Sequence, residues 1–408
     1  MSPFGSEPFP PGRATALLAA LAFLNLAFAA VLIVPSYVTL TVPGQIPDFA
    51  AFWAAGRLAL EGNPALAYDW PAHRAIEVAG LGHDFDGWMS WHYPPPAQLL
   101  VAPLGALTLF GAMVLWVGGT LGLFLWTCWR ILPHPNAVLA GLASAPTALT
   151  LINGQIGFLM AALMGLALVD LERKPVRAGV FLGLLSFKPH LVVAVPLALI
   201  ADGRWRVVLS GAAATLALAT MSWVILGGAT WGAFFASITD TTRVFTGTGA
   251  GAQRWAMGAG AYGFLRHLGT GFGVAMALHG VLALAVLAVT VKAWRSPTVT
   301  PDIKAALICF AALVATPRVL NYDLHILVIG ALFQVRHALK HRFYAGEQLL
   351  LAATALGAFL SMLAPPGVTP AIASALFAGC WWGHVRRSGK PQPPVPPTPP
   401  VATSTEPA

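Results

Sequence analysis

Charged side chains are scarce in this sequence. Asp, Glu, Lys and Arg make up only 9% of its 408 residues, while 57% are hydrophobic. Soluble domains carry about 25% charged residues, so the composition excludes an ordinary soluble protein. The apolar runs are long and continuous and do not alternate with polar residues, which argues against a membrane β-barrel. The sequence therefore predicts an all-α polytopic membrane protein.

Cysteine is also rare, and several nucleotide and metal motifs are missing. Cys128, Cys309 and Cys380 lie inside apolar runs, so we expect buried thiols and no disulfide framework or zinc site. The sequence has no Walker motif and no HExxH motif. We therefore expect no ATP-driven transport, no cofactor and no metal ligands. Whether the protein uses a divalent metal ion stays open at this point.

The net charge of +8 is compatible with a nucleic-acid ligand, but the basic residues lie between the apolar runs. Cytoplasmic loops of membrane proteins carry such an excess of Lys and Arg, so we expect no nucleic-acid partner. The clusters that we assign to the cytoplasm are Arg130, Arg173 with Lys174 and Arg177, Arg204 with Arg206, Lys292 with Arg295, residues 336–342, and Arg386 with Arg387.

These clusters set the sides of about 12 transmembrane or half-spanning helices, with both termini in the cytoplasm. We expect a cytoplasmic N-terminus at 1–14, a single transmembrane domain over 15–387 and a disordered, proline-rich cytoplasmic tail over 388–408. The first apolar run, about 15–35, is too long for a signal peptide and predicts a retained helix.

Two long loops, about 36–111 and 227–268, then lie outside. The first loop depends on one choice, because the short run 97–109 follows three prolines and is interpreted as an interfacial or re-entrant helix. Counting it as a span would place every later basic cluster outside. Polar groups concentrated on one face of a membrane protein indicate where its chemistry takes place.

Two shorter features complete the topology. A single helix over 136–152 should leave Asn153 and Gln155 outside. The segments 178–187 and 189–201 lie between basic turns and are short for full spans, so they predict a shallow hairpin with Lys188 at its apex.

Asp48 is the leading candidate for a catalytic residue. It follows Pro47 and precedes an amphipathic segment that carries Trp53 and Arg57. Asp48 could simply cap the following helix. Alternatively, a carboxylate at the boundary between water and hydrocarbon could accept a proton from an attacking hydroxyl. The residues alone leave both interpretations open.

Lys188 is unusual because it lies in an apolar segment, where an unpaired charge is costly. Together with His190, it could hold a phosphate at the apex of the hairpin. Its long side chain could instead reach the lipid headgroups.

The turn from Thr316 to His325 is the densest polar cluster between two apolar runs. Arg318 and His325 suit a phosphate group, and Asn321 and Asp323 lie beside them. The ordinary alternative is a connecting turn in which Arg318 pairs with Asp323. Earlier in the chain, His92 and Tyr93 belong either to an interfacial aromatic belt or to a platform that stacks on a sugar ring.

Several short motifs follow one another in a characteristic order. They are Pro-Asp-Phe at 47–49, Gly-Asn-Pro and Tyr-Asp within 62–69, Tyr-Pro-Pro-Pro at 93–96, Asn-Gly-Gln at 153–155, Lys-Pro at 188–189, Gly-Arg-Trp-Arg at 203–206 and Thr-Pro-Arg at 316–318. Over roughly residues 15–335, the sequence resembles glycosyltransferase family 87, the polyprenol-phosphate-mannose-dependent mannosyltransferases of the GT-C fold.

This resemblance implies a multi-pass glycosyltransferase of a bacterial plasma membrane. Such a hexosyltransferase moves a sugar, mannose in this family, from a polyprenyl-phosphate donor to a hydroxyl of a lipid or glycan acceptor. The transfer takes place on the extracytoplasmic face and inverts the anomeric carbon. The resemblance also implies that Asp48 is the general base and that His325 matches a functional histidine of the family's late external turn.

The expected site thus has three parts, embedded among membrane lipids. Asp48 is the catalytic residue. The expected ligands of the donor phosphate are Lys188, Arg254, Arg318 and His325. The expected substrate contacts are Trp53, Arg57, His92, Tyr93, Asn153, Gln155, His190, Asn321 and Asp323. The alternative function is a lipid or solute transporter or flippase without glycosyl transfer, which should contain internal repeats with broken helices; none is visible in the sequence.

Overall fold

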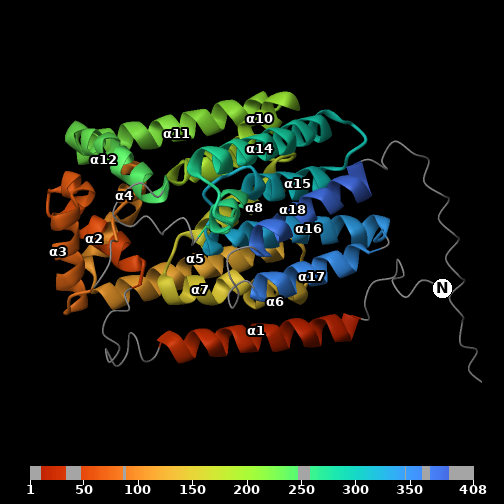
Figure 1. The fold of residues 1–408 in the computed structure, drawn as a ribbon, viewed down its shortest axis with the longest axis horizontal. Helices are drawn as coiled ribbons and strands as arrows, with labels where there is room; N and C mark the ends of the chain where they lie inside the picture. Colours follow the sequence, from red (N-terminus) through yellow and green to blue (C-terminus); the bar gives the residue numbers. More distant parts are fainter. Residues whose placement is uncertain are drawn as a thin grey trace, which may run out of the picture.

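The computed structural model describes residues 11–33, 47–85, 89–246, 258–344, 346–360 and 368–385. Within these ranges every regular element is helical and no strand occurs, so the predicted all-α class is confirmed (Figure 1). The predicted tail at 388–408 and most of the predicted N-terminal segment lie outside the described residues.

The helices follow one another along the whole described chain. The α-helices are α1 (Pro11–Ile33), α2 (Phe49–Leu60), α3 (Trp70–Leu81), α4 (Pro95–Val101), α5 (Leu109–Ile131), α6 (Pro135–Ala143), α7 (Ala145–Asn153), α8 (Gly157–Asp170), α9 (Pro175–Leu184), α10 (Ala194–Ala201), α11 (Trp205–Leu226), α12 (Gly228–Thr246), α13 (Ala261–His267), α14 (Phe272–Arg295), α15 (Pro301–Val314), α16 (His325–His341), α17 (Glu347–Leu360) and α18 (Val368–Cys380). Short 3₁₀ segments are η2 (Pro64–Tyr68), η3 (Ala102–Ala106), η4 (Leu185–Phe187), η5 (Pro189–Val192) and η7 (Asn321–Leu324), and η8 (Trp381–Val385) is a π-helical turn.

Four helices, α1, α5, α11 and α14, are long and apolar enough to cross a membrane, and the bent pair α6–α7 gives up to five such spans. They run in roughly the same direction through the bundle, with α1 along one edge and α11 and α14 along the other (Figure 1). Large apolar side chains on α11 and α14, such as Leu216 and Leu284, are exposed, as lipid-facing positions require. The predicted total of about 12 spanning or half-spanning helices stays a prediction.

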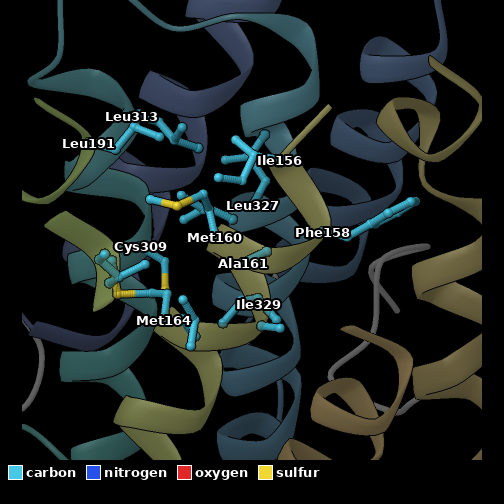
Figure 2. Close-up of a cluster of buried hydrophobic side chains, with 14 of the residues drawn as sticks. Ile156, Phe158, Met160, Ala161, Met164, Leu191, Cys309, Leu313, Leu327 and Ile329 are labelled. Atoms are coloured by element: carbon cyan, nitrogen blue, oxygen red, sulfur yellow. The ribbon is translucent and has the colours of Figure 1, made fainter. Parts of the chain in front are cut away.

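The centre of the bundle is built from helices that are buried on every side. Every residue of α15 from Asp302 to Val314 is buried, as expected for a helix surrounded by others. Met160 and Met164 of α8 lie beside Cys309 and Leu313 of α15 (Figure 2). The three cysteines are buried and free, which confirms the prediction for them.

The helix predicted over 136–152 is broken into α6 and α7, which meet at an angle of 63°. Pro146 explains the break, because it lacks an N–H and its ring collides with the carbonyl of residue 142 in a continuous helix. The carbonyls of Leu142 and Ser144 at the break each accept a hydrogen bond, both 2.8 Å long, from the buried amide of Asn25 on α1. The carbonyl of Ser144 also accepts the backbone N–H of Thr147.

The predicted external loops contain helices of their own. Within the first loop, the run 97–109 forms α4 and η3, two short segments that pack on α2 instead of one continuous span. The second loop contains α12 and α13. Between 175 and 201 the chain breaks at Lys188 as predicted, but α9 packs on α11 and α8 while α10 packs on α14, so the two halves do not form a tight hairpin. The close contact of Gly183 with α11 accounts for the position of α9, because a Cβ atom there would lie 2.6 Å from that of Ala214.

Candidate active site

Asp48 lies directly before α2, but its side chain makes no capping hydrogen bond. Its backbone is already helical, with φ −54° and ψ −21°. The carboxylate instead accepts a hydrogen bond from Gln155, with 2.6 Å between Nε2 and Oδ2. Asp48 is half-buried, so the group that could have been a simple helix cap points toward the turn between α7 and α8.

The Asn-Gly-Gln turn that carries Gln155 is fixed by close packing. Gly154 ends α7 in the left-handed conformation, with φ 66°. A Cβ atom at this position would lie 2.6 Å from Cβ of Phe49, so only glycine lets the turn approach the start of α2. Trp116 of α5 donates from Nε1 to the carbonyl of Gly154 over 3.0 Å. The sequence signal at 153–155 therefore serves to bring Gln155 to Asp48.

Tyr93 connects the first loop to this turn. Its hydroxyl donates to Oε1 of Gln155 over 3.3 Å. Its ring packs on Phe52 and Trp91, with centroid distances of 5.1 and 5.0 Å, and its carbonyl accepts a hydrogen bond from the hydroxyl of Tyr68. The rigid Tyr-Pro-Pro-Pro segment thus holds a phenol beside the amide that binds Asp48.

Lys188 and Asp323 form a buried ion pair with 2.5 Å between Nζ and Oδ1. The ammonium group also lies 4.6 Å from the ring centroid of Tyr322. The second carboxylate oxygen of Asp323 accepts the backbone N–H of Leu320 over 2.9 Å. Lys188 therefore does not extend to the lipid headgroups, and Asp323 pairs with Lys188 where a pair with Arg318 was the ordinary expectation.

Two tyrosines share the electrostatic surroundings of these charges. Burial raises the pKa of Tyr93, the carboxylates of Asp323 and Asp48 raise it further, and Arg318 opposes them. Burial likewise raises the pKa of Tyr322, and the same three charged groups act on it. The backbone of Tyr322 packs closely against Gly157, two residues after Gln155, and its ring lies 4.6 Å from Nζ of Lys188. The turn that binds Asp48 and the pair of Lys188 and Asp323 therefore lie close together.

His190 joins the Lys188 segment to the late turn through its backbone. Its carbonyl accepts a hydrogen bond from Thr316 Oγ1 over 2.7 Å. Its ring is half-buried, and Nε2 is buried without a hydrogen-bond partner in the described residues. The two segments that carry the expected phosphate ligands are therefore tied together.

His325 is completely buried at the start of α16. Its ring lies between Phe124 and Phe158, with centroid distances of 5.1 and 4.5 Å. Nδ1 lies 2.8 Å from the carbonyl of Tyr322, and Nε2 lies 3.4 Å from Oγ1 of Thr147. Both ring nitrogens thus contact other protein groups, and the contact with Tyr322 fixes the end of the turn from Thr316 to His325.

Other expected substrate contacts lie in different surroundings. Trp53 donates from Nε1 to the carbonyl of Leu107 over 2.9 Å and is buried. Arg57 pairs with Glu61 on the surface over 2.7 Å. His92 contacts Ser90 through Nε2 over 3.1 Å. The half-buried residues Asn153 and Asn321 lie at the end of α7 and the start of η7, and Arg254 lies outside the described residues.

The sequence did not single out the buried pair of His73 and Glu77 on α3. Both side chains are fully buried, with 3.5 Å between Nε2 and Oε1. Burial raises the pKa of Glu77, and the charge of Asp48 adds a small effect in the same direction. Their spacing of four residues places both side chains on one helix face, which was the only signal in the sequence. Among the described residues, no three His, Cys, Asp or Glu side chains are placed to hold a metal ion.

A comparison with known families gives this arrangement its context. Residues 91–317 match the model of glycosyltransferase family 87, which is more than half of the chain. The chain belongs to glycosyltransferase family 87. This membership, together with the apolar helices, makes the protein a membrane glycosyltransferase. The family 87 match includes Tyr93, Gln155 and Lys188, whereas Asp48 lies before it and Asp323 after it. Searches of curated proteins and of solved structures each gave no match.

Proposed function

We propose that this family 87 member transfers a sugar from a polyprenyl-phosphate donor to a hydroxyl of a lipid or glycan acceptor. The resemblance to the family's mannosyltransferases favours mannose as the sugar. The observation that carries this proposal is the hydrogen bond between Asp48 and Gln155, on a turn that packs against Tyr322, whose ring contacts the paired ammonium group of Lys188. A carboxylate and cations around one region provide a base for the acceptor and a binding site for a phosphate.

Asp48 would act as the general base. The acceptor hydroxyl attacks the anomeric carbon, and its proton moves to the carboxylate of Asp48. The bond between the anomeric carbon and the phosphate oxygen breaks on the opposite side of the ring, and its electron pair leaves with the polyprenyl phosphate. Gln155 would hold the carboxylate in the orientation that this attack requires.

Lys188 and Arg318 would bind the leaving phosphate. Asp323 holds Lys188 in place through the buried ion pair, and a positive group aimed at developing charge stabilises the transition state. The internal contacts of both His325 nitrogens support a positioning role for this residue in place of direct phosphate binding. Arg254 remains a candidate phosphate ligand.

The reaction would take place on the extracytoplasmic face of a bacterial plasma membrane, in a multi-pass GT-C-type fold. Arg130, Lys340 and Arg295 lie at the ends of α5, α16 and α14 that are remote from the Asp48 region. An excess of basic residues at that end fits a cytoplasmic location, which leaves Asp48 outside. Family membership favours this function over a transporter.

The decisive experiment compares Asp48→Asn with the unaltered protein in nanodiscs. Polyprenyl-phosphate-mannose and a native lipid extract are supplied, and the glycosylated product is identified and timed by mass spectrometry. We expect a rate loss of about 10²–10⁴ with unchanged thermal stability. Glu61→Gln is the matched control, because Glu61 is an exposed carboxylate at the other end of α2. Turnover of Asp48→Asn near that of the unaltered protein would remove Asp48 from the mechanism.

A further inference from the structure

A second polar region lies at the opposite end of the bundle from Asp48. Three helices connect the two regions. α5 carries Trp116 near the Gly154 turn and Arg130 in its last turn, and at 23 residues it is about 34 Å long. α8 likewise runs from Gly157 beside the late turn to Asp170, and α16 runs from His325 to His341. The second region is therefore a separate site.

A cleft of about 490 Å³ opens between the ends of these helices. This volume lies within the range of about 300–1,000 Å³ that is usual for small-molecule sites. Its lining includes two carboxylates, Asp170 and Glu172. It also includes five cationic side chains: Arg130, Arg173, Lys174, Arg336 and Lys340.

Both carboxylates of the cleft are bound by cations from outside its lining, and Asp170 also lies 3.7 Å from the guanidinium of Arg130. Arg177 forms two hydrogen bonds with Asp170, of 2.5 and 2.8 Å. Arg204 forms two with Glu172, of 2.6 and 2.8 Å. The carboxylates therefore do not balance the cations of the cleft, and its net charge remains positive.

The cations of the cleft differ in how firmly they are held. Arg336 is fixed by Asp302 and by the carbonyl of Ile131, which lies 3.0 Å from Nη1. Arg173 and Lys174 are exposed, and no ion-pair partner for either side chain exists among the described residues. A fixed guanidinium beside two available cations is suited to an oxygen-rich anion.

Two tryptophans indicate how deep the cleft lies in the membrane. Trp126 and Trp129 on α5 are 47% and 43% exposed, one turn or less before Arg130. The guanidinium of Arg130 lies 5.1 Å from the ring centroid of Trp126. Exposed tryptophans are typical of the membrane–water interface, so the cleft opens at the level of the lipid headgroups.

We propose that this cleft binds the phosphate of an anionic membrane lipid. Basic pockets between helices at the cytoplasmic surface bind anionic headgroups, and the cleft combines the charge, the volume and the depth that such a ligand requires. The proposal is independent of the glycosyl-transfer mechanism, because none of its residues contacts the Asp48 region.

The test is a titration of the detergent-solubilised protein with phosphatidylglycerol, read by native mass spectrometry. Arg173→Gln/Lys174→Gln should weaken binding about tenfold or more. Lys292→Gln/Arg295→Gln removes the same charge from exposed positions near the same end of the bundle, outside the cleft, and should leave affinity unchanged. Lys340→Gln should weaken binding in the same direction as the first double variant. Thermal unfolding of each variant verifies that it is folded.

Three results would overturn the proposal. If both double variants weakened phosphatidylglycerol binding equally, the binding would depend on the general surface charge and not on the cleft. Equal affinity for phosphatidylglycerol and phosphatidylcholine would exclude recognition of an anionic headgroup. Displacement of the lipid by an equal concentration of inorganic phosphate would assign the cleft to a soluble anion.

Discussion

Asp48 and Gln155 are 107 positions apart in the chain and share one short hydrogen bond. The bond exists because Gly154 lets the turn after α7 press against Phe49, and because Trp116 holds the carbonyl of that glycine. Gln155 also accepts from Tyr93. Its amide is thus oriented so that the NH₂ group faces the carboxylate, and we propose that Gln155 positions Asp48.

We therefore expect Gln155→Ala to slow glycosyl transfer. A hydrogen bond to a charged group contributes about 1.5–3 kcal/mol, so the maximal rate should fall roughly tenfold or more. The apparent affinity for the donor should stay unchanged, because the phosphate contacts are elsewhere. Asn63→Ala removes an exposed amide from the turn after α2, at the end of that helix remote from Asp48, and serves as the control. A variant whose maximal rate equals that of the unaltered protein would show that Asp48 needs no such support.

The pair of Lys188 and Asp323 is the other feature that acts at the scale of single residues. Both charges are withdrawn from solvent and satisfy each other. Loss of one partner leaves a buried charge without compensation, whereas loss of both can be nearly neutral for stability. Stability and catalysis can therefore be separated experimentally at this pair.

Asp323→Asn should lower the free energy of unfolding by about 3–5 kcal/mol. The double variant Lys188→Met/Asp323→Leu should recover most of this loss and remain inactive, because the cation for the phosphate is gone. Stability is measured by thermal unfolding in detergent, and activity by product formation. An active double variant would contradict the role of Lys188 in donor binding.

At the scale of elements, the break between α6 and α7 decides where the Gly154 turn lies. Pro146 prevents a straight helix, and the amide of Asn25 on α1 donates to the carbonyls of Leu142 and Ser144 at the break. These hydrogen bonds explain why a polar residue, Asn25, lies in the middle of the long apolar helix α1. The position of Gln155 thus depends on a contact with the first helix.

Asn25→Leu should destabilise the protein by about 1–3 kcal/mol, since it removes two hydrogen bonds at the break and takes from the carbonyl of Leu142 the amide that binds it. Phe23→Leu alters an exposed apolar position of the same helix and should have little effect on unfolding. Thermal unfolding in detergent compares the two. Identical unfolding of both variants would show that water or lipid replaces the amide of Asn25.

At the scale of the whole molecule, the two ends of the bundle differ in charge. The Asp48 region lies at one end, and the cationic cleft lies at the other. We propose that the cleft faces the cytoplasm, because basic residues gather at its end of the bundle. This orientation determines which pool of substrates can reach Asp48.

Cysteine labelling tests the orientation. Glu61→Cys should react with a membrane-impermeant maleimide in intact cells, whereas Lys174→Cys should react only after permeabilisation. The three natural cysteines are buried, so they contribute little background. The opposite labelling pattern would invert the topology and place the Asp48 region in the cytoplasm.

The class of the protein was predictable because a bilayer leaves few solutions. A chain with few charges and long apolar runs must satisfy its backbone internally, and continuous apolar runs satisfy it as helices. The Pro-Asp-Phe segment and the motifs after it likewise indicated the family that the match over residues 91–317 confirms. Such features are local, so the order of the residues reveals them directly.

The partners of the polar side chains were decided only by the tertiary structure. Lys188 pairs with Asp323 across 135 positions, and His325 faces two phenylalanines where a phosphate was expected. Periodicity identifies the buried face of a helix, but it does not identify the neighbour on that face. The site around Asp48 therefore forms only when separate helices pack together. Asp48 depends on Gln155 and Lys188 depends on Asp323, and each partner lies in a distant segment of the chain.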